Sequence, residues 1–537
     1  MKKITFILLS FLLTTYVAFS ANLYLIANNG STWTSTPTGF DNVYKVDLSN
    51  SGTNGTTAVT LTQWLSNRNA ATPTYLINGS AGATFASTDQ VWIAGGTYNV
   101  TGVWSILSGS GSATPSKLYG GFAGNENTTA DRVKGSSAWS YTNETVINGS
   151  GSSTGILNAG GDRTMVIDGI TFTACPNNAG QAIFQRPNMT IQNCKFTANS
   201  CVAVRYFIST ASKTASTSSS YFANNTYTVS GGAEGGCIMA NNGSAGGTYT
   251  ISDCEFDSNS CSASGSGASA GIKAQGAGNV EIQNCIFKNN NATAGNSSAV
   301  SLTSATCTLK NSLIYGTSLA TNKVALYVTA GKVTNCTVVN NQGGGAYLSN
   351  ASTSTIYLTN NVFWGEDVKS GQVSAVANCL GTISNCAYTS LSANYIGTVS
   401  NTVDLTVSST GLFTDPTNNV WSLTTASPLI NMGTDLNAPA SDLIGTPRPQ
   451  GSAHDIGAYE YTSSTAASVV RTAANIVTVL HDGVFANKDG RLFIYNTSGQ
   501  VINNMFVIAG EKINLRSGIY FIRLESDKGI SSQKIIL

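Results

Sequence analysis

The sequence predicts an all-β protein: a right-handed parallel β-helix (a solenoid) followed by a small C-terminal immunoglobulin-like β-sandwich. Three observations lead to this fold class. A six-residue pattern recurs between residues 191 and 388 at steps of 24 to 31 residues. Between its copies lie short alternating apolar and polar runs, bounded by Gly, Asn, Ser and Thr. The composition then changes in residues 471–537, which hold eight Lys or Arg and five Asp or Glu.

The repeated pattern places Asn or Asp two residues after an apolar residue, often adds Cys, and ends on another apolar residue. Ile191-Gln-Asn193-Cys194-Lys-Phe196 is one copy. Self-similarity at this period is typical of a solenoid, in which each unit buries its apolar face by stacking on its neighbours. Asn tolerates left-handed backbone, so its position suits a sharp bend. We expect a structural ladder of stacked, hydrogen-bonded side chains at Asn193, Asn224, Asp253, Asn284, Asn311, Asn335, Asn360 and Asn385.

The runs between the bends favour strands over helices. A helical repeat needs apolar residues at a helical period over ten or more positions. The runs from Ala325 to Val328 and from Gly345 to Leu348 alternate instead, as short strands do. Three such strands in each turn describe a parallel β-helix with coils about 4.8 Å apart. Crossovers between parallel strands are almost always right-handed, so we expect that hand.

The N-terminus predicts export. Lys2 and Lys3, an apolar run from Ile4 to Leu13 and small residues before Ala21 are typical of a secretory signal peptide. A membrane-spanning helix is the weaker interpretation, because the apolar run is short. No later segment is apolar for long enough to predict a transmembrane segment. The expected organisation is a signal peptide (1–20), an N-terminal cap region (21–80), the β-helix (81–410), terminal coils (411–461), a linker (462–470) and the C-terminal sandwich (471–537).

Two segments before the repeat are expected to begin the β-helix. Residues 89–98 predict a strand entering a first coil, and the Gly-rich residues 117–126 predict a corner of the next. These glycines are not a phosphate loop, because no G-x-x-x-x-G-K-[ST] pattern occurs. An amphipathic patch at residues 61–65 is expected to cover the open edge of the first coil, since an uncovered edge invites aggregation.

All eleven cysteines lie between Cys175 and Cys386. In an exported protein they suggest disulfides, but five of them occupy one repeat position, where they would stack inward as free, small, apolar thiols. Only Cys254 with Cys285, and Cys175 with Cys201, would lie on neighbouring coils where a bond is plausible.

Composition argues against other classes of ligand. The net charge is +1, only 10% of residues are charged and no basic stripe is visible, so nucleic acid is a poor candidate. The chain has two histidines and no paired C-x-x-C motifs, so no zinc site is expected. No cofactor is expected, although bound Ca²⁺ remains an open alternative.

A family resemblance rests on V-W-I-A-G-G-T-Y (91–98), L-Y-G-G-F-A-G-N-E (118–126) and the repeats. Together they resemble exported parallel β-helix proteins of the pectate-lyase-like superfamily. Residues 411–461 are similar to the choice-of-anchor Q tail of a subset of that group, through Phe413-Thr-Asp415-Pro416, Ser427-Pro428 and Asp455-Ile-Gly457. His454 departs from that tail, which usually has an aliphatic residue there.

Residues 471–537 resemble the C-terminal sorting domain of type IX secretion substrates. The resemblance lies in Ile494 to Val501, Leu515 to Ile522 and Lys534 to Leu537. It implies that the type IX machinery is a partner, and that the protein crosses the outer membrane of a Gram-negative cell for surface attachment or release. An ordinary immunoglobulin-like module is the alternative.

The resemblance raises the question of catalysis, because its members include polysaccharide lyases and glycosidases that work along one exposed strand face. Hydrolysis needs two carboxylates, and a calcium-assisted lyase needs clustered acids with a base. Acids such as Glu255 and Asp257 are expected on a different face. Aligning the alternating runs gives an outward column without a carboxylate: Arg205, Ile238, Lys273, Ser301, Tyr327 and Tyr347.

No catalytic residue and no metal ligand is therefore assigned. Arg205, Lys273, Ser301, Tyr327 and Tyr347 form a candidate glycan-contact face, since tyrosines stack on sugar rings and cations suit acidic polysaccharide. An ordinary solvated sheet face remains open, as does a lyase of acidic polysaccharide that uses Arg205 and Lys273. The group Asp442, Arg448, Asp455 and Glu460 is interpreted as an ion-pair network closing the last coil. The expected function is a secreted, surface-displayed protein with a structural, adhesive or glycan-binding role.

Overall fold

A computed structural model describes most of the chain, and its residues fall into two compact units divided between residues 461 and 462. The described residues are 21–27, 33–48, 76–77, 80–81, 88–100, 104–106, 117–152, 155–159, 164–176, 180–208, 212–228, 236–243, 246–262, 268–293, 297–317, 323–350, 355–365, 372–406, 411–462, 477–480, 483–486, 489–496, 499–509, 511–513, 515, 519–526 and 529–536. The predicted signal peptide and the patch at residues 61–65 lie outside them.

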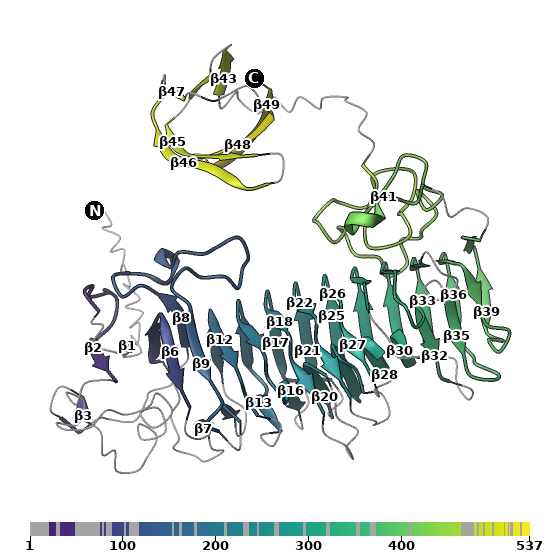
Figure 1. Cartoon of the computed structure of the whole chain (residues 1–537), viewed down its shortest axis with the longest axis horizontal. Coiled ribbons are helices and arrows are strands. Elements are labelled where there is room, and N and C mark those ends of the chain that lie inside the picture. The colour runs from purple at the N-terminus through teal and green to yellow at the C-terminus, as the bar shows by residue number, and fades with distance from the viewer. Residues whose placement is uncertain are drawn as a thin grey trace, which may run out of the picture. The chain divides into compact units, whose positions relative to one another are not determined.

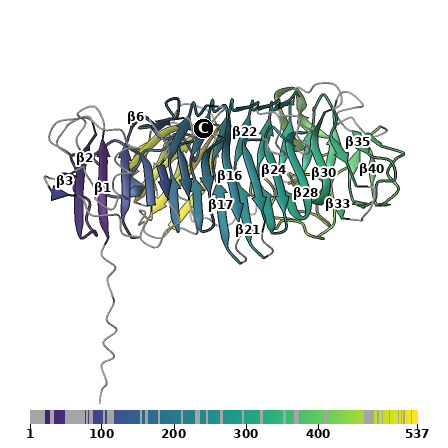
Figure 2. The same cartoon turned by 90° about the horizontal axis from the view of Figure 1, so that it is seen from below.

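The first unit is a parallel β-helix whose coils stack along one axis (Figures 1 and 2). The strands of the coils lie on three faces, which we call face 1, face 2 and face 3. Faces 1 and 2 form one 23-stranded sheet, because β28 and β30 bend from one face into the other. Face 3 is a separate 12-stranded sheet. The strands within each face pair in parallel, which confirms the predicted fold class for this unit.

The strand bounds follow the order of the coils on each face. Face 1 consists of β7 (Trp104–Ile106), β10 (Leu157–Ala159), β13 (Gln181–Gln185), β16 (Val202–Ile208), β20 (Ile238–Asn242), β24 (Ile272–Gly276), β28 (Ser297–Lys310), β30 (Val324–Thr334), β32 (Ala346–Leu348), β35 (Gln372–Ala375) and β38 (Ser390–Leu391). Face 2 consists of β2 (Asn42–Asp47), β1 (Asn22–Ala27), β5 (Gln90–Ala94), β8 (Lys117–Phe122), β11 (Met165–Asp168), β14 (Met189–Gln192), β17 (Thr214–Ser218), β21 (Thr248–Ser252), β25 (Asn279–Gln283), parts of β28 and β30, β33 (Ile356–Thr359), β36 (Thr382–Ser384) and β39 (Thr398–Ser400). Face 3 consists of β6 (Gly96–Asn99), β9 (Thr145–Asn148), β12 (Ile170–Thr173), β15 (Lys195–Thr197), β18 (Tyr221–Ala223), β22 (Glu255–Asp257), β26 (Ile286–Lys288), β29 (Leu313–Tyr315), β31 (Thr337–Val339), β34 (Val362–Trp364), β37 (Ala387–Tyr388) and β40 (Val403–Asp404).

Shorter elements complete the first unit. They are β19 (Thr226–Tyr227), β23 (Ser260–Cys261) and β27 (Asn291–Ala292) in a small parallel sheet, the antiparallel pairs β3 (Leu76–Ile77) with β4 (Ser80–Ala81) and β41 (Phe413–Asp415) with β42 (Val420–Leu423), and the 3₁₀ turns η2 (Thr129–Asp131) and η4 (Pro416–Asn418).

Aligned apolar side chains fill the interior of the β-helix. The clearest file consists of phenylalanines on face 3, whose rings stack with centroids 4.7 to 5.2 Å apart. Its members are Phe172, Phe196, Phe222, Phe256 and Phe287, all essentially buried. The spacing matches the distance between paired strands. Each coil therefore buries its apolar face only because the next coil supplies an equivalent side chain in register.

The bend between faces 2 and 3 confirms the predicted left-handed position. Seven of the eight predicted residues stand there with φ between 49° and 55°. The exception is Asn224. The repeated pattern aligns Phe222 with Ile191, but in the structure Phe222 pairs with Phe196 and Phe256 on face 3. Ser219 (φ 47°) takes the bend position in that coil, and Asn224 lies at the next bend. The segment that contains Asn224 matches the repeated pattern in sequence, but it lies one strand later in its coil than the other copies do.

The predicted side-chain ladder at this bend is only partly formed. Asn284 donates to Asp253, Asn311 donates to Asn284 and Asn360 donates to Asn335, at 2.9 to 3.2 Å. A more complete ladder lies inside the coil after face 3, where the sequence pattern did not place it. There Asn199, Asn225 and Asn259 each donate an amide N–H to the next asparagine oxygen at 2.9 Å, ending at Asn290.

These interior amides also satisfy the backbone of the bend. Asn225 Nδ2 donates to the carbonyl of Phe196, and Asn259 Nδ2 donates to the carbonyl of Phe222, each at 2.8 Å. The backbone N–H of Asn225 donates to Asn259 Oδ1 at 3.0 Å. Because these groups are buried, each bond prevents an unsatisfied polar group in the core.

The cysteines occupy the interior as predicted. All eleven are buried and none is in a disulfide in this structure. The thiols at the repeat position donate to carbonyls two residues before them, as Cys254 does to Ser252 at 3.2 Å. Burial raises the pKa of the Cys194, Cys336 and Cys386 thiols to about 12.

Two domain boundaries differ from the sequence prediction. The expected cap region already supplies strands to face 2, because β1 pairs in parallel with both β2 and β5. Residues 411–461, expected to be terminal coils, instead fold back onto the outside of face 3 (Figure 1). We call them the flank subdomain. Its apolar residues Phe413, Trp421 and Ile456 pack against Val339 and Val362 of β31 and β34.

The second unit contains two antiparallel sheets around its own core. One sheet has the order β43-β44-β47 and the other β46-β45-β48-β49. Their buried residues form one cluster, as expected of a small sandwich. The bounds are β43 (Val477–Leu480), β44 (Gly483–Ala486), β45 (Gly490–Tyr495), β46 (Val501–Val507), β47 (Lys512–Ile513), β48 (Ile519–Ser526) and β49 (Gly529–Ile536).

We predict that the interior ladder contributes more stability than the bend asparagines. Asn259→Ala should lower the free energy of unfolding by about 3 kcal/mol, because it leaves a buried carbonyl and two buried donors without partners. Asn193→Gly, at a bend that glycine adopts freely, should change it by less than about 1 kcal/mol. Urea titration followed by circular dichroism measures both, and equal effects would contradict the prediction.

We also predict that the native thiols are inert. A maleimide should label none of the eleven cysteines in native protein, since only an accessible thiolate reacts and all eleven thiols are buried. After denaturation without reductant, mass spectrometry should find all eleven labelled. A shortfall of two or four would instead reveal disulfides, for which Cys254 with Cys285 is the first pair to test.

Candidate functional site

The predicted glycan-contact column lies on the outside of face 1. Strand register joins Arg205, Met239, Lys273 and Ser301 on successive coils, followed by Tyr327 and Tyr347. Ile238 was therefore misassigned: it pairs with Val204 and Ile272 in the core, and Met239 is the outward residue. The alternating run that contains Ile238 was therefore aligned one residue out of register with its neighbours.

Much of this column is not accessible. Lys273 is 1% exposed and Ser301 is 0% exposed, so neither can meet a dissolved polymer in this structure. Arg205, Tyr327 and Tyr347 are half-buried. The two tyrosine rings stack on each other at 5.8 Å, and Arg205 lies 5.9 Å from the Phe184 ring. Only these three predicted residues remain available for glycan contact, and Lys273 is unsuited to the role of a lyase base.

A groove on face 3 has the stronger geometry. It encloses about 440 Å³ between the outside of β9, β12, β15 and β18 and a loop of residues 123–144, which we call the strap loop. Its lining includes Trp139, Glu144, Thr171, Lys195 and Tyr221. Strand register places Lys195 beside both Thr171 and Tyr221. Residues far apart in sequence thus meet because they lie on neighbouring coils.

The groove combines an aromatic platform with an ion pair. The rings of Trp139 and Tyr221 stack at 5.4 Å with an interplanar angle of 7°. Beside them Lys195 Nζ lies 2.8 Å from Glu144 Oε1, which also accepts a 2.6 Å hydrogen bond from Thr171 Oγ1. Burial alone would raise the pKa of Glu144, but the bonds from Lys195 and Thr171 outweigh it and lower that pKa. Glu144 therefore stays ionised as an acceptor.

The strap loop is held by a buried arginine. Arg132 Nη1 donates to the Gly120 carbonyl at 2.9 Å and to Asp168 Oδ1 at 3.0 Å. Its guanidinium also lies 4.9 to 5.4 Å from the rings of Tyr119, Phe122 and Tyr141. Such cation–π contacts are strongest away from water. The loop that carries Trp139 is thus fixed to the first coils.

A second polar cluster continues face 3 beyond the groove. Lys288 Nζ lies 2.6 Å from Glu255 Oε1 and 3.3 Å from Asp257 Oδ2. Tyr221 links the two places, because its hydroxyl donates to Asp257 Oδ2 at 3.2 Å. Glu255 and Asp257 were correctly expected on a different face from the predicted column. The predicted column lies on face 1, whereas these acids lie beside the groove on face 3.

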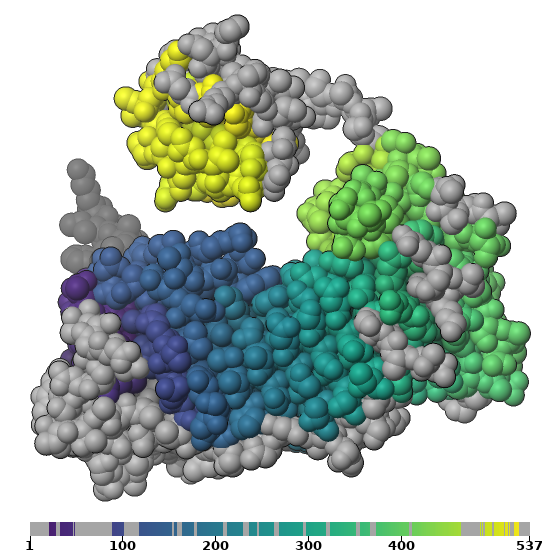
Figure 3. Space-filling model, viewed as in Figure 1, coloured from purple at the N-terminus to yellow at the C-terminus, as the bar shows by residue number. Residues whose placement is uncertain are grey.

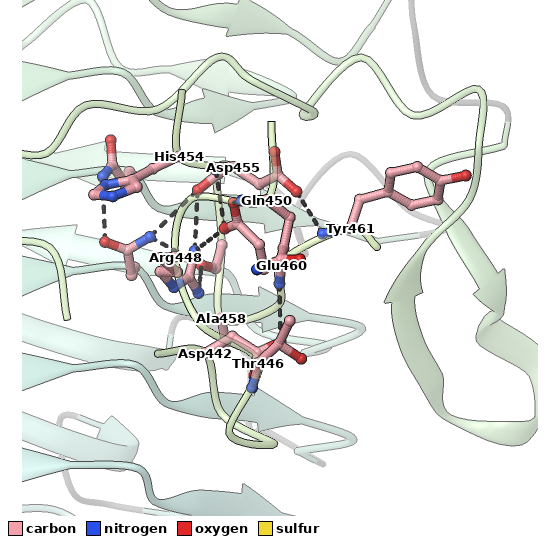
Figure 4. A network of polar contacts seen from close by, with 12 residues as sticks. Asp442, Thr446, Arg448, Gln450, His454, Asp455, Ala458, Glu460 and Tyr461 are labelled. Carbon is pink, nitrogen blue, oxygen red and sulfur yellow. Dashed lines mark hydrogen bonds and ion pairs between the residues drawn. The ribbon is translucent and has the colours of Figure 1, made fainter. Parts of the chain in front are cut away.

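The network at Asp442, Arg448, Asp455 and Glu460 lies within the flank subdomain (Figure 4). Arg448 Nη1 and Glu460 Oε2 are 2.8 Å apart, with both side chains 0% exposed. Asp442 accepts the backbone N–H groups of Ile444, Thr446 and Glu460. Carboxylates saturated in this way have no access to a substrate, so the network is structural, as predicted. It braces the flank subdomain on face 3 rather than closing the last coil.

The bend asparagines dock the flank subdomain. Asn335 Nδ2 donates to the carbonyls of Asp455 and Gly457, and Asn360 Nδ2 donates to the carbonyl of Thr434 at 2.6 Å. Asn311 and Asn385 bond to the carbonyls of Ser441 and Met432. The predicted ladder positions thus serve partly as a contact surface for a later segment.

Two further results concern the described residues only. They include no group of three or more His, Cys, Asp or Glu placed to hold a metal ion. They also include no helix long and apolar enough to cross a membrane.

No protein-family model matches the chain, and no curated protein matches it. Among solved structures, the crystal structure of pectate lyase Pel9A matches with 14% sequence identity and a TM-score of 0.30, covering 73% of this chain and 94% of that chain. At this TM-score the likeness carries no argument about function.

Sequence reasoning missed the groove for a specific reason. Lys195, Tyr221 and Glu255 each stand one residue before the buried phenylalanine of their coil, so their outward column was implicit in the repeat. Trp139 comes from a segment without any repeat. Its position over Tyr221 depends on how the strap loop folds, which no spacing in the sequence indicates.

We predict that Arg448 is essential for the flank subdomain. Arg448→Met leaves the buried carboxylate of Glu460 without its cation, so it should lower the free energy of unfolding by about 3 to 5 kcal/mol. The partly exposed Glu144–Lys195 pair provides a matched control. Lys195→Met should lower the free energy of unfolding by less than about 1 kcal/mol. Hydrogen exchange of residues 429–461 should rise in the first variant only. Unchanged protection there would contradict a bracing role.

Proposed function

We propose that this protein is an exported glycan-binding β-helix protein whose binding site is the groove on face 3. The observation that carries the proposal is the stacked pair of Trp139 and Tyr221 beside the Glu144–Lys195 ion pair. An aromatic surface for the apolar face of a sugar ring, flanked by a few oriented polar groups, is the usual composition of a small-molecule site. The half-buried Tyr327–Tyr347 pair on face 1 offers a second, shallower surface of related chemistry.

Surface display is part of the same proposal. The N-terminal sequence is typical of a signal peptide, and residues 471–537 resemble a type IX sorting domain, so export to the outer surface of a Gram-negative cell would place the groove where glycans are met. Deleting residues 471–537 should leave the protein inside the cell envelope, which fractionation and immunoblotting would detect. Unchanged export of the truncated chain would contradict this part.

We predict that Trp139→Ala weakens glycan binding by about thirtyfold, because a central aromatic contact is worth roughly 2 kcal/mol. A glycan array followed by isothermal titration calorimetry with the strongest responder measures the change. Tyr357→Ala removes an exposed tyrosine of face 2 and should leave the affinity unchanged. Equal affinities of the wild type and Trp139→Ala would overturn the site.

The same samples test the enzymatic alternative. A lyase would release unsaturated uronate products from acidic polysaccharide, seen as rising absorbance. We expect none, because Lys273 is buried and Lys195 is engaged with Glu144. A signal that persists in Trp139→Ala would replace the binding proposal by catalysis elsewhere.

A further inference from the structure

We infer that the occupant of face 3 is a neutral, hydroxyl-rich polysaccharide that lies along the β-helix axis, spanning the groove and the cluster of Glu255, Asp257 and Lys288. This rests on the proposed function and adds to it a substrate class, an orientation and a second contact region. Three features carry the inference: the continuity of the two polar regions, their lack of net positive charge and the walls beside them.

The two regions form one continuous surface. Strand register runs from Lys195 through Tyr221 to Glu255, and from Asp257 to Lys288, on consecutive coils. From β15 to β26 there are three strand steps, or about 14 Å. A polysaccharide that lies across the strands therefore contacts the Trp139–Tyr221 platform and then Lys288. A chain lying parallel to the strands would leave the surface after three residues of β18.

The charges of this surface favour a neutral ligand. Lys195 is neutralised by Glu144, and Lys288 by Glu255 and Asp257, so three carboxylates face two ammonium groups. A polyuronate gains no net attraction from such a surface. Sugar hydroxyls both donate and accept, so they can bond to the carboxylate oxygens and to the ammonium protons alike. This differs from the acidic polysaccharide expected from Arg205 and Lys273 on face 1.

Walls limit the length that can be bound. In Figure 3 the strap loop and the flank subdomain rise from the same side of the β-helix, and the surface of the middle coils lies lower between them. Beyond Lys288 the outward column continues with Tyr315, Val339 and Trp364. The flank subdomain covers these residues, and Trp421 lies 6.0 Å from Tyr315 and 6.3 Å from Trp364. From β9, the first strand that lines the groove, to β26, which carries Lys288, there are five strand steps, or about 24 Å.

The test is calorimetric titration of the full chain with neutral β-linked gluco-, xylo- and manno-oligosaccharides of two to eight units, with hexagalacturonate as the acidic probe. For at least one neutral series, affinity should rise with length and then level off, with little dependence on salt. Hexagalacturonate should bind at least about tenfold more weakly than the neutral hexamer. Preference for hexagalacturonate with a steep salt dependence would overturn the neutral class.

Substitution separates this inference from the proposed function. Lys288→Met keeps the aliphatic stem and should weaken hexamer binding about tenfold while leaving disaccharide binding unchanged. Glu255→Gln should also weaken binding of the hexamer and not of the disaccharide. Lys332→Ala, which removes an exposed lysine of face 2, should leave the binding of both unchanged. If Trp139→Ala abolishes binding while Lys288→Met and Glu255→Gln bind the hexamer normally, the groove is the binding site but the ligand does not extend to Lys288. If no neutral or acidic probe binds, both proposals fail.

Discussion

Every feature of the first unit depends on the parallel register between successive coils. Backbone hydrogen bonds between coils fix that register, and the interior file of Asn199, Asn225, Asn259 and Asn290 holds it at the bend where face 3 ends. The first three amides each donate to the asparagine of the next coil, and all four donate to a buried carbonyl of the preceding coil. Because a slip of one residue would break these bonds and turn the phenylalanine file outward, the register is strongly specified.

The same register organises the outer surface. Columns of like position on face 3 bring Lys195, Tyr221 and Glu255 together although about thirty residues separate each from the next. A bare column of this kind is only a flat, solvated sheet. The strap loop and the flank subdomain change it into a bounded trough, one by placing Trp139 over Tyr221 and the other by covering the coils beyond Lys288.

Two buried charge clusters hold these additions in place, and neither has the exposure that a catalytic site needs. Arg132 with Asp168 fastens the strap loop, and Arg448 with Glu460 braces the flank subdomain. Their carboxylates are largely used by neighbouring donors, so their role is to fix the walls. The charged groups of the groove, Glu144 and Lys195, are instead partly exposed.

The repeat alone determined the β-helix, the left-handed bends and the inward thiols, because periodic side chains encode stacking directly. It failed where a local segment imitates the pattern, as at Asn224, or where a run is displaced by one residue, as at Ile238. It could not reveal that Lys273 is buried, that residues 411–461 fold back on face 3, or that Trp139 reaches Tyr221. The last two results come from segments without periodicity, whose positions are decided by contacts between distant parts of the chain. The candidate site therefore depends on tertiary structure, whereas the β-helix beneath it is predicted by the repeat alone.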